Sequence, residues 1–277
     1  MLGFGKKKKK AAPDGFDIPS FPAAVLNLLT KLRDPDISTN ELAGDLETDP
    51  GLHVRVLKTV NSAAFGLSHK VSDVHHAVNL LGRSRLESLV LSVAVKNGLT
   101  GNNKAPWLNM KLFWATAARR AAIARGLSAE LHPHVQGDMF TLGLLQDMGV
   151  SLLANREGDR YRDIYLNWQE EDDFDLIEQE QLHFGTDHAT LSAQLAEFWE
   201  FPESLVSAIA QHHQQHESSE LPLSAKIAAL IKGPASADDS KMLAEKAQQL
   251  FGLDSHLTID LIENVLQESQ ELAAALS

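Results

Sequence analysis

The sequence predicts an all-α protein of two packed helical subdomains, and three observations lead to this prediction. Apolar residues recur at helical spacing through most of the 277-residue chain. Residues that start or end helices bracket these runs. No segment alternates polar and apolar residues between turn signals, as a strand would. A polar stretch over residues 98–106 divides the pattern, so we expect subdomains over residues 16–105 and 106–232.

Two flanking segments complete the expected organisation. Residues 1–15 carry charge and glycine with little to bury, so we expect a disordered basic tail that includes Lys6 to Lys10. Contact of this tail with anionic lipid or nucleic acid is an alternative, but a solubilising tail is the simpler interpretation. Residues 233–277 contain two amphipathic patterns and are expected to form a helical extension.

The first subdomain contains clear helix signals. Ser38 and Glu41 form a capping box, and the helix that they start should end near Asp49. Pro50 suits the first turn of the next helix, because its missing N–H would have no intrahelical partner there. Ser72 is the expected cap of a third helix.

The last helix of this subdomain is predicted to be widely buried. Gly82 should close the third helix, and Ser84 with Glu87 form a second capping box. The following helix, over residues 85–97, is apolar over much of its surface, which indicates burial on more than one side. We therefore expect it to pack between the two subdomains.

The second subdomain is predicted to contain longer helices. Gly143 and Gly149 should permit close contacts between them. The pattern predicts helices over residues 107–125 (closing at Gly126), 135–154, 159–170 and 174–183, then one that ends at Trp199 and one from Pro202 to His212 and His213.

Composition limits the classes of function. The net charge of −12 argues against nucleic acid as a partner. The absence of cysteine excludes disulfides and zinc–thiolate sites and is typical of a reducing cytoplasm. No apolar run approaches the roughly 18 residues that span a bilayer. No apolar core follows the lysine run, so a secretory leader is not predicted. We expect a cytoplasmic protein without a membrane span.

One segment has the outline of a helix-turn-helix, which makes DNA binding an alternative. It covers residues 38–61, with His53, Arg55 and Lys58 on its second helix. DNA contact needs a basic surface. The acidic residues beside the turn and the overall charge oppose it, so packing of a helix pair is the preferred interpretation.

Several motifs together carry a resemblance to a known family, over roughly residues 16–232. They are Ile18-Pro19-Ser20-Phe21-Pro22, Asp49-Pro50, Asn61-Ser62, Ala77 to Gly82, Gly143 to Gly149, Phe184 to His188, Trp199 to Pro202, and His212-His213. With these motifs the chain resembles the HDOD family. The resemblance implies the helical frame of the HD metal phosphohydrolases, often with the metal ligands lost, and a degenerate HD-type fold for the second subdomain.

The resemblance also implies where metal ligands would fall in this sequence. Two positions are substituted: Thr116 stands where a first histidine is expected, and Gln146 replaces the histidine of the HD pair. A final aspartate is missing, since Ala228 and Ala229 stand in the helix expected to supply it. Four ligand residues remain: Asp147, His188, His212 and His213. A glutamine amide or a threonine hydroxyl is a weak metal ligand, so a two-metal centre is not expected.

Two functions from different classes follow. The preferred one is a non-catalytic signal-transduction module without a cofactor, which binds a protein or small ligand. In this interpretation six side chains persist as a hydrogen-bonded polar remnant pocket: Thr116, Gln146, Asp147, His188, His212 and His213. The alternative is a metal-dependent phosphohydrolase with a reduced site, in which the four remaining residues hold one divalent ion. The resemblance implies regulatory roles tied to cyclic-dinucleotide, two-component or motility pathways, without fixing which.

Overall fold

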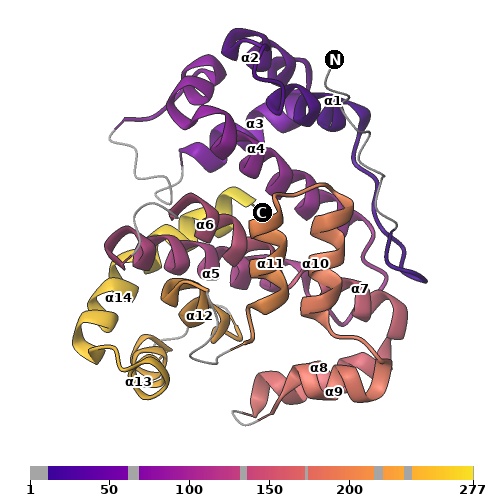
Figure 1. Cartoon of the computed structure of the whole chain (residues 1–277), viewed down its shortest axis with the longest axis vertical. Helices are drawn as coiled ribbons and strands as arrows, with labels where there is room; N and C mark the ends of the chain where they lie inside the picture. The colour runs from indigo at the N-terminus through magenta and orange to yellow at the C-terminus, as the bar shows by residue number, and fades with distance from the viewer. Residues whose placement is uncertain are drawn as a thin grey trace, which may run out of the picture.

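The computed structural model describes residues 12–61, 69–131, 136–171, 174–214, 221–233 and 239–276. Every regular element in these ranges is a helix, which confirms the all-α prediction (Figure 1). The lysine run at residues 6–10 and Ser62 lie outside the described residues. No helix in the described ranges is both long and apolar enough to cross a membrane.

The N-terminal helices start where their capping residues predict. The Glu41 N–H donates to Ser38 Oγ over 3.2 Å, and the Leu52 N–H donates to the Asp49 carboxylate over 3.0 Å with Pro50 in the first turn. These contacts confirm two of the predicted helix starts. The helices are α1 (Ala23–Leu32), α2 (Thr39–Thr48), α3 (Pro50–Val60) and α4 (Val74–Gly101).

The fourth helix differs from the prediction in two ways. Asp73, and not Ser72, caps it, because the Asp73 carboxylate accepts the N–H groups of His75 and His76. The predicted stop at Gly82 is confirmed, because Gly82 has non-helical angles (φ 71°, ψ 171°) at a kink that separates two helical segments of α4. The predicted loop from residue 98 is wrong over its first half: helix continues to Gly101, with Leu99 buried.

The helix over residues 85–97 is buried as predicted. Its apolar residues Leu86, Leu89, Val90, Leu91, Val93, Ala94 and Val95 are all in the core. One apolar core runs from this helix into both halves of the chain. The boundaries of the subdomains remain a prediction.

Ten further helices follow in the described residues, with α5 at their centre and α14 packed along it (Figure 1). They are α5 (Met110–Leu131), α6 (Gln136–Leu145), α7 (Met148–Glu157), α8 (Asp159–Glu170), α9 (Leu176–Phe184), α10 (His188–Phe198), α11 (Glu203–Gln211), α12 (Leu223–Ala229), α13 (Asp239–Phe251) and α14 (Ser255–Leu276).

Two predicted helix boundaries in this half are wrong for identifiable reasons. The expected single helix over residues 135–154 is broken at Gln146 and Asp147, which separate α6 from α7. The predicted stop at Gly126 fails because α5 continues to Leu131. Gly126 instead admits α14, since a β-carbon at this position would overlap the Val265 side chain. A second core cluster, shared by α5, α12, α13 and α14, therefore ties the C-terminal extension to the second subdomain.

Candidate functional site

Four polar side chains from three parts of the second subdomain converge on one buried point. Asp147 lies at the break between α6 and α7, His188 is the first residue of α10, and His212 and His213 directly follow α11. One ligand atom from each lies within 4.8 Å of every other. We call these four residues the His–Asp cluster. They are the four residues that the sequence marked as surviving ligands.

A close helix contact fixes one half of the cluster. A β-carbon on Gly149 would overlap the backbone of His188, so only glycine lets α7 approach α10 this closely. The Gly149 N–H also donates to Ser192 Oγ over 2.7 Å. Because Asp147 directly precedes α7 and His188 opens α10, this contact places the two residues side by side.

A buried arginine occupies one oxygen of Asp147. The Arg120 guanidinium, from α5, contacts Asp147 Oδ2 through Nη1 at 2.5 Å and donates to the Ile231 carbonyl through Nε and Nη2. Burial acts to raise the pKa of Asp147, but Arg120, followed by His212 and His188, holds that pKa well below its usual range. Asp147 is therefore ionised, with only Oδ1 directed at the histidines.

A buried glutamate orients His188. Glu180 Oε2 accepts the His188 backbone N–H and lies 2.7 Å from His188 Nδ1, while Tyr161 donates its hydroxyl to Oε1 over 2.5 Å. Burial acts to lower the pKa of His188, but Glu180 outweighs it and raises that pKa. With Nδ1 held by Glu180, Nε2 points into the cluster, 2.9 Å from His213 Nε2.

Glu180 and Arg120 were not identified from the sequence, although both leave a signal. Leu176, Glu180 and Phe184 follow one another at i, i+4 and i+8, so Glu180 stands in the apolar stripe of α9. Arg120 follows Arg119 inside an alanine-rich run that is otherwise apolar. A charged residue within an apolar stripe indicates a buried partner.

The contact between His212 and Asp147 lacks a hydrogen-bond donor when the imidazole is neutral. His212 Nδ1 lies 2.7 Å from the Ile209 carbonyl, which can only accept, so Nδ1 carries the proton. Nε2 then presents a lone pair to Asp147 Oδ1 at 3.1 Å, and neither atom has an aligned hydrogen bond among the described residues. A second proton on His212 or a cation would relieve this contact. Three imidazole nitrogens and one carboxylate oxygen are a donor set that a divalent transition metal or zinc accepts.

The two substituted positions contribute no ligand. Thr116 donates its hydroxyl along its own helix to the Leu112 carbonyl over 3.0 Å. Gln146 is 1% exposed, and its amide oxygen and nitrogen have no hydrogen-bond partner among the described residues. The expectation of a hydrogen-bonded remnant is therefore wrong for Gln146. Ala228 and Ala229 are buried and offer no carboxylate.

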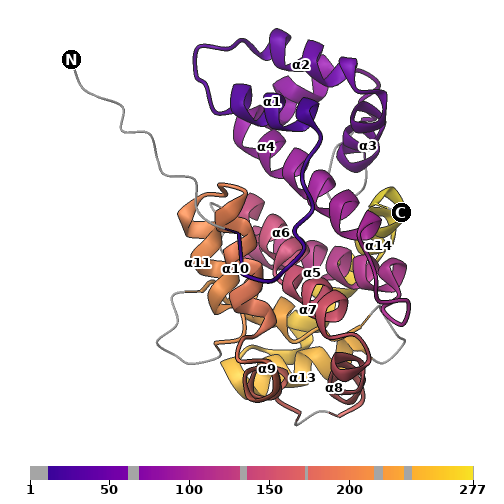
Figure 2. The ribbon, with the colours of Figure 1, turned by 90° about the vertical axis from the view of Figure 1, so that its right-hand side faces the viewer.

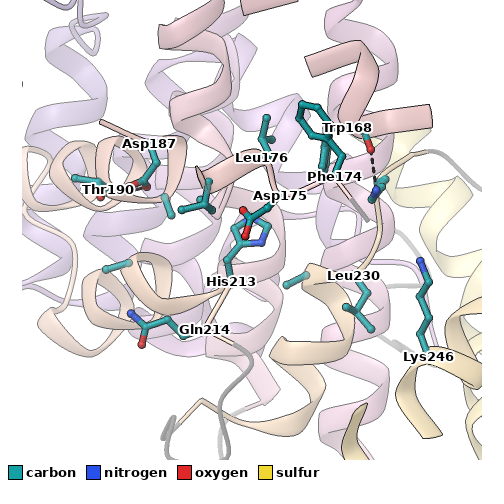
Figure 3. Close-up of a pocket in the computed structure, with 15 residues that line it drawn as sticks. Trp168, Phe174, Asp175, Leu176, Asp187, Thr190, His213, Gln214, Leu230 and Lys246 are labelled. Atoms are coloured by element: carbon teal, nitrogen blue, oxygen red, sulfur yellow. Dashed lines mark hydrogen bonds between the residues drawn. The ribbon is translucent and has the colours of Figure 1, made fainter. Parts of the chain in front are cut away.

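His213 connects the cluster to a cavity of about 620 Å³ (Figure 3). The pKa of His213 is well below its usual value, because of burial and of the neighbouring His212 and His188. Trp168 and Lys232 also line the cavity, and Lys232 donates to the Trp168 carbonyl over 2.7 Å. The other lining residues are Phe174, Asp175, Leu176, Ile177, Asp187, Ala189, Thr190, Ala210, Gln214, Ala229, Leu230 and Lys246.

The residues considered for DNA contact lie on α3, which packs against α2. Arg55 and Lys58 are exposed on α3, and His53 is half-buried there. The preceding helix α2 carries Glu41 and Asp45, which both pair with Lys31. These acidic groups oppose contact with phosphates.

Comparisons with known proteins agree with this fold. The family model for the HDOD domain matches residues 18–215. A crystal structure of a provisionally assigned phosphohydrolase from Shewanella amazonensis is similar over 94% of this chain and 95% of that chain, with a TM-score of 0.74 and 25% identity. An HDOD domain protein of unknown function from Geobacter sulfurreducens is similar over 95% of this chain and 93% of its own, with a TM-score of 0.67 and 23% identity.

A curated relative covers less of the chain. An uncharacterized protein from Treponema pallidum is 26% identical over 201 residues, which is 71% of this chain. The match spans only 38% of the Treponema protein.

Proposed function

This chain belongs to the HDOD domain family, and on that premise we propose that it is a non-catalytic signal-transduction module that binds a signalling protein or a small ligand. The HDOD assignment fits a regulatory module. The observation that carries the proposal is the ion pair between Arg120 and Asp147, which neutralises the Asp147 carboxylate from within the protein.

The ion pair argues against a two-metal centre. In this chain Asp147 Oδ2 contacts Arg120, and only Oδ1 faces the histidines. The guanidinium charge would also repel a second cation at this position. Residues Thr116, Gln146 and Ala228 supply no replacement ligands.

Elemental analysis combined with a hydrolysis assay tests the proposal. We expect the purified protein to carry no stoichiometric divalent metal. We also expect it not to hydrolyse cyclic dinucleotides or simple phosphate esters when manganese is added. A full equivalent of metal, together with turnover that is lost in His188→Ala, would overturn the non-catalytic proposal.

A specific observation favours a second candidate, a phosphohydrolase with one metal ion. Asp147 Oδ1 and His212 Nε2 face each other without an aligned hydrogen bond, as two ligands of one cation would. One divalent ion held by Asp147, His188, His212 and His213 would supply Lewis-acid activation of water. The protein's own contribution is orientation: Glu180 and the Ile209 carbonyl hold the Nδ1 atoms of His188 and His212, so that their Nε2 atoms face the cluster.

Zinc titration with and without turnover separates the two candidates. Binding of one equivalent of zinc without hydrolysis would give a metal-loaded signalling module. Binding with hydrolysis would support the second candidate. For the partner itself, a pull-down from the native host with the wild-type chain and the matched variant His213→Ala would show which interactions depend on the cavity.

A further inference from the structure

The turn between α10 and α11 has an unusual backbone conformation. Glu200 has a φ of +59°, and it is the one non-glycine residue with positive φ in the described part of the chain. A side chain with a β-carbon disfavours this left-handed region, so surrounding contacts must hold the residue there. Two hydrogen bonds that end α10 hold Glu200 in this conformation: the Phe201 N–H donates to the Ala196 carbonyl over 2.9 Å, and the Glu200 N–H donates to the Glu197 carbonyl over 3.1 Å.

A further contact with Glu200 comes from the N-terminal helices. Arg33, directly after α1, donates to the Glu200 carbonyl over 2.9 Å through Nη2 and to its carboxylate over 3.1 Å through Nη1. The Arg33 Nε donates to Glu87 of α4 over 2.6 Å. One guanidinium therefore ties α1, α4 and the α10–α11 turn together.

An aromatic contact lies beside this arginine. Phe21 precedes α1 and stacks on Trp199, with ring centroids 4.9 Å apart and an interplanar angle of 25°. Both rings are buried. In Figures 1 and 2 the turn lies at the end of α10 and α11 that faces the N-terminal helices. We call Arg33, Glu87, Glu200, Phe21 and Trp199 the latch.

The helices that leave this turn carry three of the four cluster residues. His188 begins α10, and His212 and His213 directly follow α11. Since α10 has 11 residues and a helix rises about 1.5 Å per residue, the latch lies roughly 16 Å from the cluster along the helix axis. The two helices pack against each other and so form one hairpin.

We propose that the latch is a conformational switch through which the N-terminal subdomain sets the position of the histidines in the cluster. Asp147 and His188 are held together, because α7 packs on the start of α10 through Gly149, and Arg120 holds the Asp147 carboxylate. Release of Arg33 detaches the turn from α1 and α4. The α11 end of the hairpin then moves, and His212 and His213 move relative to Asp147. An event on the N-terminal helices is thereby transmitted to the cavity beside His213.

Hydrogen–deuterium exchange on the full chain tests this proposal. Arg33→Ala should speed exchange about tenfold both at the turn and at residues 209–214, a factor within the usual range of coupling between sites. Amides of α14 serve as an internal reference and should not change. The control variant is Arg162→Ala, which removes an exposed arginine paired with Asp159 and Asp163 on α8 and should leave both regions unchanged.

A second variant separates the strain from the charge. Glu200→Gly adopts the positive φ without penalty and keeps the carbonyl that Arg33 binds, so residues 209–214 should exchange nearly as slowly as in the wild type. Coupling is reciprocal, so His213→Ala should speed exchange at residues 199–202.

Two results of the exchange experiment would contradict the proposal. Faster exchange in Arg33→Ala that is confined to residues 199–203, or that rises equally in α14, would overturn the proposal. If Arg33→Ala does not fold, Arg33→Lys keeps the charge, cannot make the same paired contacts, and is judged by the same criteria.

Discussion

The two sides of the His–Asp cluster differ in which polar groups face its centre. On the α5–α6 side, Thr116 donates along its own helix, the Gln146 amide has no hydrogen-bond partner among the described residues, and Arg120 supplies a permanent positive charge. On the α10–α11 side, His188, His212 and His213 all remain, with their Nε2 atoms turned inward. The difference teaches that a buried arginine can neutralise one side of a histidine–carboxylate cluster while the histidines on the other side keep a convergent geometry.

The histidines on the α10–α11 side are held in place by contacts within the protein. Glu180 and Tyr161 hold His188, and the Ile209 carbonyl holds His212. Such partners fix the ring orientation and the tautomer of a histidine whether or not an ion is bound. The α10–α11 side can therefore serve a binding function on its own.

Removal of the Arg120 charge should have the largest effect on stability. Arg120→Met leaves the Asp147 carboxylate buried without its partner, and we expect a loss of about 3–5 kcal/mol in the free energy of unfolding. Urea denaturation monitored by circular dichroism measures this. The control Arg162→Met, at an exposed position on α8, should change stability by less than about 0.5 kcal/mol. A loss below about 1 kcal/mol for Arg120→Met would mean that the ion pair does not organise this side of the site.

Removal of the carboxylate behind His188 should have the next largest effect. Glu180→Leu leaves the His188 N–H groups and the Tyr161 hydroxyl without their buried acceptor, at a cost of about 2–3 kcal/mol. Glu180→Gln keeps an acceptor oxygen and should cost less than half of that. Thermal and urea unfolding of both variants checks the difference. Equal losses in the two variants would show that packing volume, and not hydrogen bonding, is what Glu180 provides.

The fold could be predicted further than the site, for physical reasons. The caps at Ser38 and Asp49 are local interactions, so sequence spacing alone identifies them. The break at Gln146 and Asp147 could not be read locally, because both flanking segments have helical patterns and the break follows from contacts made across the fold. The four cluster residues were found through the family resemblance. Arg120 and Glu180 were missed because their partners lie 27 and 8 residues away in sequence.

The pKa values of His213 and His188 are shifted in opposite directions, so the stability of the fold should depend on pH on both sides of pH 6.5. The lowered pKa of His213 means that only the unfolded chain takes up its proton just below pH 6.5, so stability falls as the pH drops through this window. The raised pKa of His188 means that the folded chain keeps its proton just above pH 6.5, so stability falls as the pH rises there. Each effect has a slope of up to about 1.4 kcal/mol per pH unit.

Substitutions can separate the two parts of the pH profile of stability, the acidic limb below pH 6.5 and the limb above it. With a chelator present, His213→Asn should flatten the acidic limb, and Glu180→Gln should flatten the limb above pH 6.5, because Glu180 is what raises the pKa of His188. Urea midpoints measured between pH 5 and pH 8 provide the test. A wild-type chain and a His213→Asn variant with parallel profiles below pH 6.5 would contradict the assignment.

The smallest expected effect concerns Gln146 and has the opposite sign. Its buried amide has no hydrogen-bond partner among the described residues, so it costs desolvation and returns little. Gln146→Met keeps the length of the side chain and removes both polar atoms, and we expect it to raise the free energy of unfolding by about 1 kcal/mol.

Gln146→His, in contrast, should lower the free energy of unfolding by about 1–3 kcal/mol and create no hydrolysis, because Thr116 and Ala228 still offer no ligand. Urea unfolding of the two variants side by side, with a manganese-supplemented phosphatase assay of the second, decides the matter. A loss of stability in Gln146→Met would show that the amide is bonded and that this side of the cluster is also a polar network. Robust hydrolysis by Gln146→His would mean that Arg120 does not close the site to metal chemistry.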